Sequence, residues 1–220
     1  MKRVLVVGAG GFAREVKWLI SEIARHGGAK LAFAGYVVSD VSRLGEHDSR
    51  EEVRGDLAWL RSSRGEWDLL AMGIGTPAAR LKVAEELADF GDEVWPGLVH
   101  PRVIMDAESC RVGPGALVCA GTIATVNVVI ERFALVNLAC TLGHECRVGA
   151  GSVLNPTVNV SGGVQIGSGV LVGTGAQLLQ YVNIGDGATV GAGSVVNKQV
   201  APGVTVVGVP AKPLVKSGAP

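Results

Sequence analysis

Residues 148–178 run VGAGSVLNPTVNVSGGVQIGSGVLVGTGAQL, with an aliphatic residue at every sixth position from Val148 to Leu178. The period continues in both directions, so that an aliphatic residue or alanine recurs every six residues from Val112 to Val196. Four residues after each of these positions stands a small or β-branched residue. A period of six fits neither an amphipathic helix nor an alternating strand, but it is a known period of parallel β-helices. We therefore predict a coil of short strands here, with both rows pointing inward.

Three hexads make one triangular turn of such a coil. The larger residue of each hexad then fills the centre, the smaller one fits near a corner, and the 32 glycines of the chain supply positive φ at the turns. Cys140 and Cys146 belong to the smaller row, and Cys110 fits that row one hexad earlier. The four cysteines show no CxxC pair and no metal-ligand spacing. We predict that these three cysteines are buried fillers and that no metal is bound.

The first 98 residues follow a different pattern, in which strand and helix signals alternate. Strands are expected at 3–7, 31–38, 67–73 and near Val94, helices at 12–25, 56–61 and 77–90, and a polar loop at 39–54. This order predicts a small Rossmann-like α/β domain of βαβ type with a parallel sheet. The predicted domains are therefore residues 1–98 and, for the β-helix with its C-terminal tail, residues 99–220.

The charge balance excludes some classes of partner. Twenty basic and twenty acidic residues give a formal net charge of zero, and no run of like charges suits a nucleic acid or a membrane surface. The opening MKRVLVVGAG has an apolar run too short for a signal peptide or a membrane span. We therefore expect a cytoplasmic protein with no nucleic acid or membrane partner.

Short motifs connect this chain to a known family. VGPGAL, VGAGSV, IGSGVL and IGDGAT, with the terminal VGVPAK, resemble the hexapeptide repeats of left-handed β-helix acyltransferases. The opening VVGAGGFAREV, the HP pair at 100–101 and the HEC triplet in the coil resemble a narrower group of bacterial sugar acyltransferases. That group includes sialic acid O-acetyltransferases and N-acetyltransferases that act on nucleotide-linked 4-amino sugars. The resemblance implies a left-handed coil, a homotrimer, acetyl-CoA as co-substrate and a nucleotide sugar as acceptor.

His144 is the only histidine between residue 101 and the C-terminus, and it stands two residues past the inward Leu142, at a predicted coil corner. Acetyl transfer to an amine or a hydroxyl needs a base with a pKa near neutral, and imidazole meets that need. The resemblance implies that His144 is this general base and that Glu145 orients it, with direct attack on the thioester. The alternative is a solvated surface histidine without a chemical role.

The turn GAGGFA, residues 8–13, follows a predicted strand and precedes a predicted helix, so its amides suit a phosphate. A bound NAD is disfavoured because no acidic residue ends the second strand, the first candidate being Asp40. The resemblance implies that this turn and the later GIGT hold the diphosphate of a nucleotide sugar. A tight turn that only needs small residues is the alternative. The substrate-binding residues that the resemblance implies are Gly10, Gly11, Phe12, Gly73, Gly75 and Asn137.

The resemblance further implies that acetyl-CoA lies along a groove beside the coil. The positions that correspond to coenzyme contacts are Val153, Gly173, Thr174, Gly191 and Ala192. Lys198 and Lys212 are candidates for contact with the coenzyme phosphates, although solvated lysines are the alternative.

Three positions depart from the family pattern. Phe12 stands where a histidine is frequent, Val38 and Ser39 stand where an acidic pair is frequent, and Val153 replaces a second histidine near the coenzyme. These departures leave the sugar and its nucleotide open. We expect an N-acetyltransferase acting on a nucleotide-linked amino sugar. The alternatives are an O-acetyltransferase acting on a sialic acid or polysaccharide hydroxyl, and a non-catalytic nucleotide-sugar-binding or scaffold protein.

Overall fold

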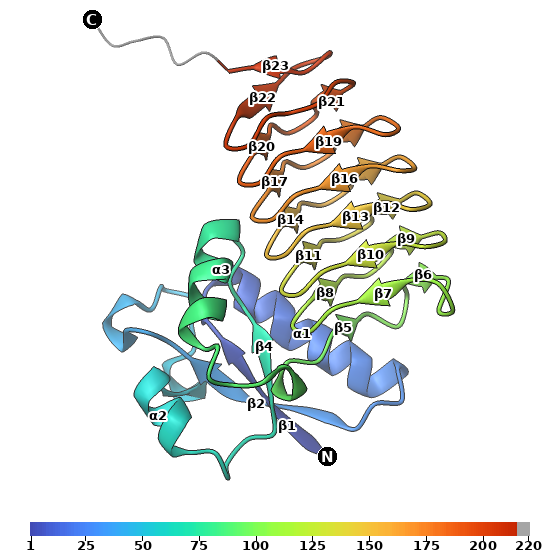
Figure 1. Ribbon diagram of the computed structural model, residues 1–220. Coiled ribbons are helices and arrows are strands. Elements are labelled where there is room, and N and C mark those ends of the chain that lie inside the picture. The colour runs from blue at the N-terminus through green and yellow to red at the C-terminus, as the bar shows by residue number, and fades with distance from the viewer. Residues whose placement is uncertain (215–220) are drawn as a thin grey trace, which may run out of the picture.

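The computed structural model describes residues 1–214, which form an α/β domain followed by a triangular column of stacked strands (Figure 1). The fold class predicted from the sequence is confirmed. Residues 215–220, the end of the predicted second domain, lie outside the described residues.

The N-terminal sheet has four parallel strands in the order β3-β2-β1-β4. Their bounds are β1 (Lys2–Val7), β2 (Leu31–Val37), β3 (Val53–Gly55) and β4 (Leu69–Met72). The last four residues of the central strand β1 are all buried, since helices cover both faces of the sheet.

Three α-helices and three short 3₁₀ turns accompany this sheet. The helices are α1 (Gly11–His26), α2 (Leu57–Ser62) and α3 (Pro77–Glu86), and the 3₁₀ turns are η1 (Val41–Arg43), η2 (Arg50–Glu52) and η3 (Asp92–Val94). Helix α1 buries the apolar stripe Val16, Leu19, Ile20 and Ile23, as its sequence spacing predicts. The residue that caps its C-terminus is Gly27, whose amide donates to the carbonyl of Ile23.

Two expectations for this domain were wrong. No strand forms near Val94: the chain makes the 3₁₀ turn η3 there, β4 remains an edge of the sheet, and Trp95 packs its ring against Phe133 of the coil, with centroids 5.0 Å apart. The polar segment 39–54 is not a plain loop, since it contains two 3₁₀ turns and the start of β3. A three-residue strand is too short to show an alternating pattern, and its pairing with Tyr36 and Val37 of β2 defines it.

From Leu98 the chain winds through three parallel sheets, which are the three faces of the column. The first face contains β5 (Leu98–Val99), β8 (Leu117–Val118), β11 (Leu135–Val136), β14 (Val153–Leu154), β17 (Leu171–Val172), β20 (Thr189–Val190) and β22 (Thr205–Val207), closed by antiparallel β23 (Lys212–Pro213). The second face contains β6 (Ile104–Met105), β9 (Ile123–Ala124), β12 (Thr141–Leu142), β15 (Asn159–Val160), β18 (Gln177–Leu178) and β21 (Val195–Val196). The third face contains β7 (Arg111–Val112), β10 (Val129–Ile130), β13 (Arg147–Val148), β16 (Gln165–Ile166) and β19 (Asn183–Ile184).

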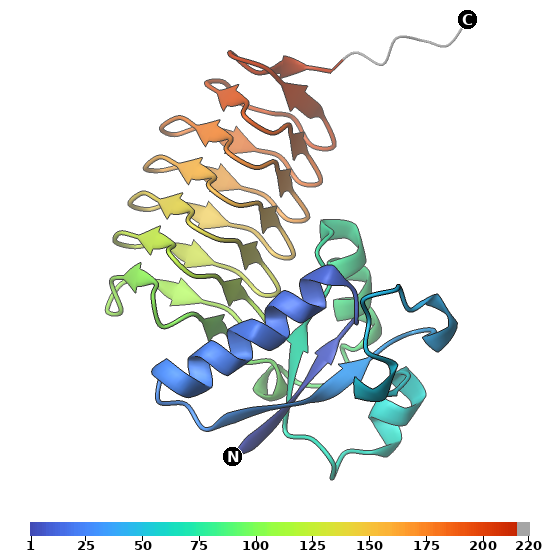
Figure 2. The ribbon, with the colours of Figure 1, turned by 180° about the vertical axis from the view of Figure 1, so that it is seen from behind.

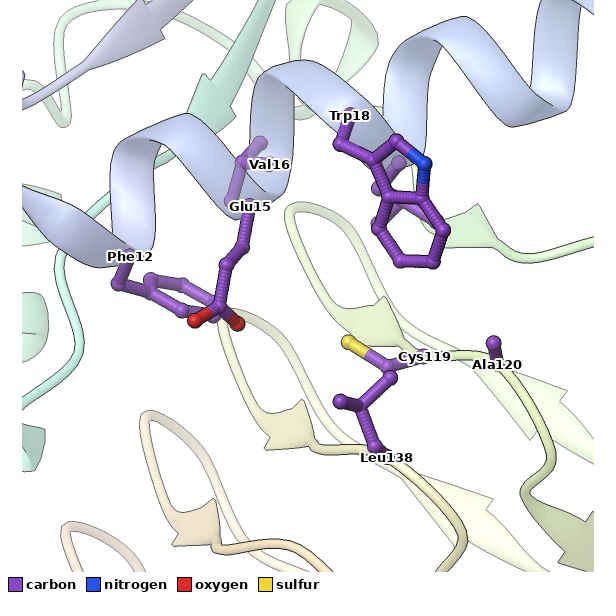
Figure 3. Close-up of a pocket in the computed structure, with 8 residues that line it drawn as sticks. Phe12, Glu15, Val16, Trp18, Cys119, Ala120 and Leu138 are labelled. Carbon is purple, nitrogen blue, oxygen red and sulfur yellow. The ribbon is translucent and has the colours of Figure 1, made fainter.

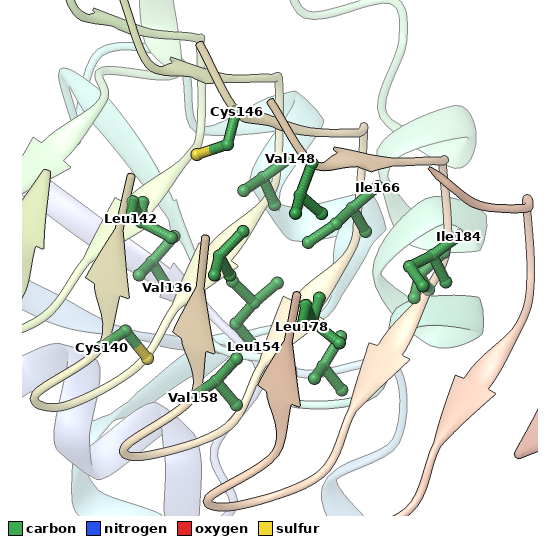
Figure 4. Packing of buried hydrophobic residues seen from close by; sticks show 14 of the residues in the cluster. Val136, Cys140, Leu142, Cys146, Val148, Leu154, Val158, Ile166, Leu178 and Ile184 are labelled. Atoms are coloured by element: carbon green, nitrogen blue, oxygen red, sulfur yellow. The ribbon is translucent and has the colours of Figure 1, made fainter. Parts of the chain in front are cut away.

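Within these faces, successive coils pair residues that are 18 positions apart, such as Leu135 with Val153 and Val153 with Leu171. Both predicted rows lie in one continuous core, and labelled side chains such as Leu142, Leu154 and Leu178 point into the column (Figure 4). Val112 is only partly buried, because β7 is the first strand of its face.

The cysteine prediction is confirmed for all three residues of the smaller row. Cys110, Cys140 and Cys146 lie in the core of the column without disulfide bonds. Burial raises the pKa of Cys140 to about 11 and that of Cys146 to about 12, so both are thiols at neutral pH. These two cysteines act as small apolar side chains.

Helix α1 joins the two parts of the molecule, because it packs between the N-terminal sheet and the first coils (Figure 2). Outward residues of the first face, among them Leu117, Leu135 and Val153, share one apolar cluster with Val16 and Leu19 of α1. The lower part of the first face is therefore an internal interface, whereas the second face carries the exposed side chains of Ile104 and Ile123.

Candidate functional site

His144 and Glu145 occupy the corner between β12 and β13, where the second face meets the third. Glu145 adopts a left-handed backbone with φ of 60°, which turns the chain at the corner and directs the pair outward. Their side chains are 51% and 62% exposed, and Nδ1 of His144 lies 3.6 Å from Oε2 of Glu145. This distance permits electrostatic attraction between the ring and the carboxylate without a hydrogen bond.

The backbone of this corner is held by the coils on both sides. The amide of Glu145 donates to the carbonyl of Val126 at 3.0 Å, and the amide of Gly163 donates to the carbonyl of His144 at 2.8 Å. Nε2 of Gln165 also donates to the carbonyl of Glu145 at 3.1 Å. An exposed side chain thus stands on a rigid backbone, which is the arrangement that a general base requires.

Gly162 makes room for the imidazole of His144. A Cβ at position 162 would overlap Nε2 and Cε1 of the ring, because the ring lies across the next coil at this residue. Sequence reasoning missed this glycine, although the signal was present: Gly162 follows His144 by 18 residues, which is one full coil.

The turn at residues 8–13 lies at the carboxyl ends of the parallel strands, as predicted. A pocket opens there between β1, β2 and β4, lined among others by Gly10, Val38, Asp40 and Ile74. A Cβ at Gly10 would meet no atom within 4 Å, and one at Gly11 would meet only Nη2 of Arg14 at 3.7 Å, so the approach to this end of α1 is open. The position agrees with the rule that α/β sheets bind ligands beyond their carboxyl edge.

The two glycines of the GIGT segment differ in their surroundings. A Cβ at Gly73 would lie 2.6 Å from Cγ1 of Val6 and 2.8 Å from Cβ of Ala13, so close packing of β1 and α1 requires glycine there. A Cβ at Gly75 would lie 3.6 Å from Cβ of Phe12, which is ordinary contact. The neighbour Ile74 lines the pocket.

A second pocket lies between α1 and the corner where the first face meets the second (Figure 3). It is lined by Phe12, Glu15, Trp18, Cys119 and Leu138, among others, so that one carboxylate faces an apolar hollow. Phe12 therefore lines this second pocket, beside the coil, and not the strand-end pocket that Gly10 lines.

Asn137 precedes Leu138 of that second pocket and is itself buried. It is 8% exposed, its Oδ1 accepts a hydrogen bond from the amide of Leu138 at 2.8 Å, and its carbonyl accepts one from Oγ1 of Thr122 at 3.1 Å. The bond to Oδ1 supplies a structural reason for an asparagine at this position, whereas the bond from Thr122 uses the backbone carbonyl.

The residues expected to contact the coenzyme are distributed over two environments. Gly173, Thr174, Gly191 and Ala192 form two stacked rungs at the corner above Asn137 and Leu138, and a Cβ at Gly173 would overlap the backbone of Ala192. Val153 is only 1% exposed and packs in the α1 cluster, so its side chain offers no surface to a coenzyme.

In a single chain these groups do not converge. The His144 corner and the corner of Gly173 and Gly191 lie at opposite edges of the second face, separated by its strands. Neither pocket described above is lined by His144.

None of the helices within residues 1–214 is long and apolar enough to cross a membrane. Within the same residues, no group of three or more histidine, cysteine, aspartate or glutamate side chains is arranged to hold a metal ion.

Comparisons with known proteins agree with this architecture. Residues 163–198 match the family model described as bacterial transferase hexapeptide (six repeats). A search of curated proteins gives no match. Among solved structures, the chain is similar to PerB from Caulobacter crescentus, solved in complex with CoA and GDP-perosamine, with 30% identity, 98% of both chains covered and a TM-score of 0.82.

Two further structures are similar over nearly their whole length. The acetyltransferase domain of PglB from Neisseria gonorrhoeae FA1090 shares 29% identity over 97% of this chain and 100% of that domain, with a TM-score of 0.83. WeeI from Acinetobacter baumannii AYE shares 28% identity over 97% of this chain and 100% of its own, with a TM-score of 0.79. These likenesses confirm that the coil is a left-handed β-helix.

Proposed function

The chain belongs to the hexapeptide-repeat sugar acetyltransferases, and on that premise we propose that it transfers the acetyl group of acetyl-CoA to the amino group of a nucleotide-linked sugar. PerB, similar over 98% of both chains, was solved with CoA and GDP-perosamine. The observation that carries the proposal is the His144 and Glu145 pair on its rigid, exposed corner, with Gly162 leaving room for the ring. We further propose a cytoplasmic location, because the reaction consumes acetyl-CoA.

In the proposed reaction, His144 is the general base. Its Nδ1 faces Glu145, which favours a proton on Nδ1 and leaves the lone pair of Nε2 for the substrate. The sugar amine attacks the thioester carbonyl carbon and gives a proton to Nε2. The carbon–sulfur bond then breaks, and the proton passes to the departing CoA thiolate. Positioned bases of this kind contribute about 10²–10⁴-fold to rate.

The separation of the two corners supports a site shared between subunits. We propose a homotrimer in which the His144 corner of one copy faces the Gly173 and Gly191 corner of the next, with acetyl-CoA in the groove between them. Exposed apolar side chains at both corners, including Val126, Leu138 and Tyr181 at 46%, 36% and 67% exposure, suit a surface that a second copy covers.

The shared site is tested by mixing two inactive variants. His144→Ala removes the base, and Ala192→Trp blocks the groove on the other corner. Mixed trimers assembled from both should regain activity, because some interfaces then combine two intact corners. Sedimentation of the wild-type protein as a monomer, or no recovery after subunits are shown to mix, would refute the shared site.

The reaction is tested with labelled acetyl-CoA and a panel of UDP-, GDP- and dTDP-linked amino sugars. We expect acetylation of the amine of at least one sugar and no transfer to its hydroxyl analogue. Transfer to sialic acid or polysaccharide hydroxyls instead would identify an O-acetyltransferase. Binding of nucleotide sugars without any transfer would identify a binding or scaffold protein.

A further inference from the structure

Arg80 of α3 is fully buried. It lies where the α/β domain contacts the β-helix. Its Nε donates to the carbonyl of Phe133 at 2.8 Å, and its Nη1 donates to the carbonyl of Ile74 at 2.6 Å and to that of Met72 at 3.5 Å. Its Nη2 has no hydrogen-bond partner, and no carboxylate of residues 1–214 forms an ion pair with it. Burial lowers the pKa of Arg80 to about 9, so the guanidinium is still charged at neutral pH.

The three acceptors belong to two parts of the molecule, the α/β domain and the β-helix. Met72 ends β4, and Ile74 lies in the turn that follows and lines the strand-end pocket. Phe133 is a corner residue of the coil with a left-handed φ of 55°, and its ring is fixed against Trp95. One planar guanidinium therefore connects the proposed nucleotide turn directly to the β-helix.

Packing alone is a poor explanation for this residue. A buried charge loses several kcal/mol of hydration, and apolar side chains of similar volume often replace buried charges without loss of stability. Phe133 and Met72 belong to the same apolar cluster, so a large hydrophobic residue would suit the surroundings. What an apolar residue cannot do is hold two carbonyls of separate domains at a fixed distance.

We infer that Arg80 is a positioning residue that holds the nucleotide-sugar pocket in register with the β-helix. The inference rests on the proposed function for the identity of the ligand. The nucleotide is held by the α/β domain and the base stands on a coil, so the relative placement of the two parts determines whether the amine meets the thioester. Acetyl-CoA lies along coils alone in the proposed site, and its binding does not need Arg80.

The kinetic test compares Arg80→Lys and Arg80→Met with the wild-type enzyme. We expect kcat/KM for the nucleotide sugar to fall about tenfold or more in Arg80→Met, because misplacement by about 1 Å reduces rates up to about 10²-fold. The KM for acetyl-CoA should stay within about twofold of wild type. Arg80→Lys should recover part of the loss, since an ammonium keeps the charge and can reach one carbonyl.

Two control variants separate this role from a general loss of stability. Lys82→Met changes an exposed cation on the same helix and should behave as wild type. Leu87→Ala opens a cavity in the same domain core and should lower Tm without changing the ratio of the two KM values. Equal effects of Arg80→Met on both substrates, unchanged kinetics, or the same pattern in Leu87→Ala would overturn the inference.

A second measurement does not depend on activity and covers the case that Arg80→Met fails to fold. Amide hydrogen exchange at residues 73–76 should be at least about tenfold faster in Arg80→Lys than in the wild type, since about 1.4 kcal/mol of local stability corresponds to tenfold. Unchanged exchange there would overturn the inference. Wild-type protein that binds none of UDP, GDP and dTDP and acetylates no sugar would instead refute the proposed function.

Discussion

The β-helix and the N-terminal sheet are built by opposite rules. In the β-helix, each residue contacts the residues 18 positions before and after it, so position within the hexad determines its surroundings. In the N-terminal sheet, β1 pairs with Leu31–Val37 on one side and with Leu69–Met72 on the other, at separations that no period describes. The first region can be interpreted residue by residue, whereas the second yields only its element order.

This difference indicates where function is located in each region. The inward rows of the β-helix are constrained by packing, whereas some corner residues, such as His144, direct their side chains outward. His144 and Gly162 occupy one such corner on adjacent coils. In the sheet domain, the candidate site is the common edge where several strands end. The candidate functional residues of both regions thus lie at corners and strand ends, outside the packed rows.

The largest expected effect is at the His144 corner. His144→Ala should lower kcat by about 10²–10⁴-fold, because the base is lost, while the Kd for acetyl-CoA stays near the wild-type value. Steady-state kinetics and calorimetric titration with acetyl-CoA measure these quantities. His47→Ala, which alters an exposed histidine of the sheet domain, is the matched control. Near-native turnover in His144→Ala would remove the general base from the mechanism.

The stacked architecture predicts that a cavity lowers the free energy of unfolding more in an inner coil than in a terminal coil. Leu154→Ala, with a coil on each side, should lower the free energy of unfolding by about 2–5 kcal/mol. Val206→Ala, on the last rung that extends the stack from Val190, should cost less, about 1–2 kcal/mol at about 0.8 kcal/mol per buried CH₂. Urea unfolding measures both values. Equal losses at the two positions would show that the column is not a nearest-neighbour stack.

Gly162 provides a smaller and more selective change at the corner. Gly162→Ala places a methyl group where the His144 ring lies, and the exposed ring can respond by rotating away. We expect kcat to fall about tenfold while Tm stays almost unchanged, because the backbone at 162 needs no left-handed φ. Gly65→Ala, at a site with open space, is the control. A large decrease in Tm without a decrease in kcat of the folded enzyme would contradict this account of the corner.

The accuracy of sequence-based prediction differed between the regions for a physical reason. The six-residue period identified both buried rows and three core cysteines, because each coil repeats the contacts of the last. In the sheet domain, the short strand β3 was missed and a strand near Val94 was wrongly expected, because tertiary contacts decide both.

The candidate site shows the same limit. The exposed position of His144 beside Glu145 followed from the hexad position, and Gly162 was within reach of the same period. The role of Arg80 could not be predicted in this way. An arginine in a predicted helix is expected in solvent, and its acceptor Phe133 lies 53 residues further along the chain. The burial of Asn137 and Val153 likewise depends on how α1 packs against the coil, which no local pattern reveals.

The smallest expected effect concerns the junction of the two regions. His100 is 2% exposed, its Nδ1 accepts from the amide of Arg102 at 3.0 Å, and its Nε2 lies 3.9 Å from Oε2 of Glu22 on α1. Burial lowers the pKa of His100, with Arg102 and His26 acting in the same direction and Glu22 opposing them.

Because the pKa of His100 is lower in the folded state, the unfolded chain takes up the proton first as the pH falls. The stability associated with neutral His100 is therefore complete above about pH 6.5, the usual histidine pKa, and is lost at lower pH. His100→Asn keeps an acceptor for the Arg102 amide and should flatten the decline in unfolding free energy between pH 7.5 and pH 5.5. Urea titrations at several pH values measure this slope, with His47→Asn as the control. An unchanged slope in His100→Asn would show that protonation of the buried His100 does not cause the loss of stability at low pH.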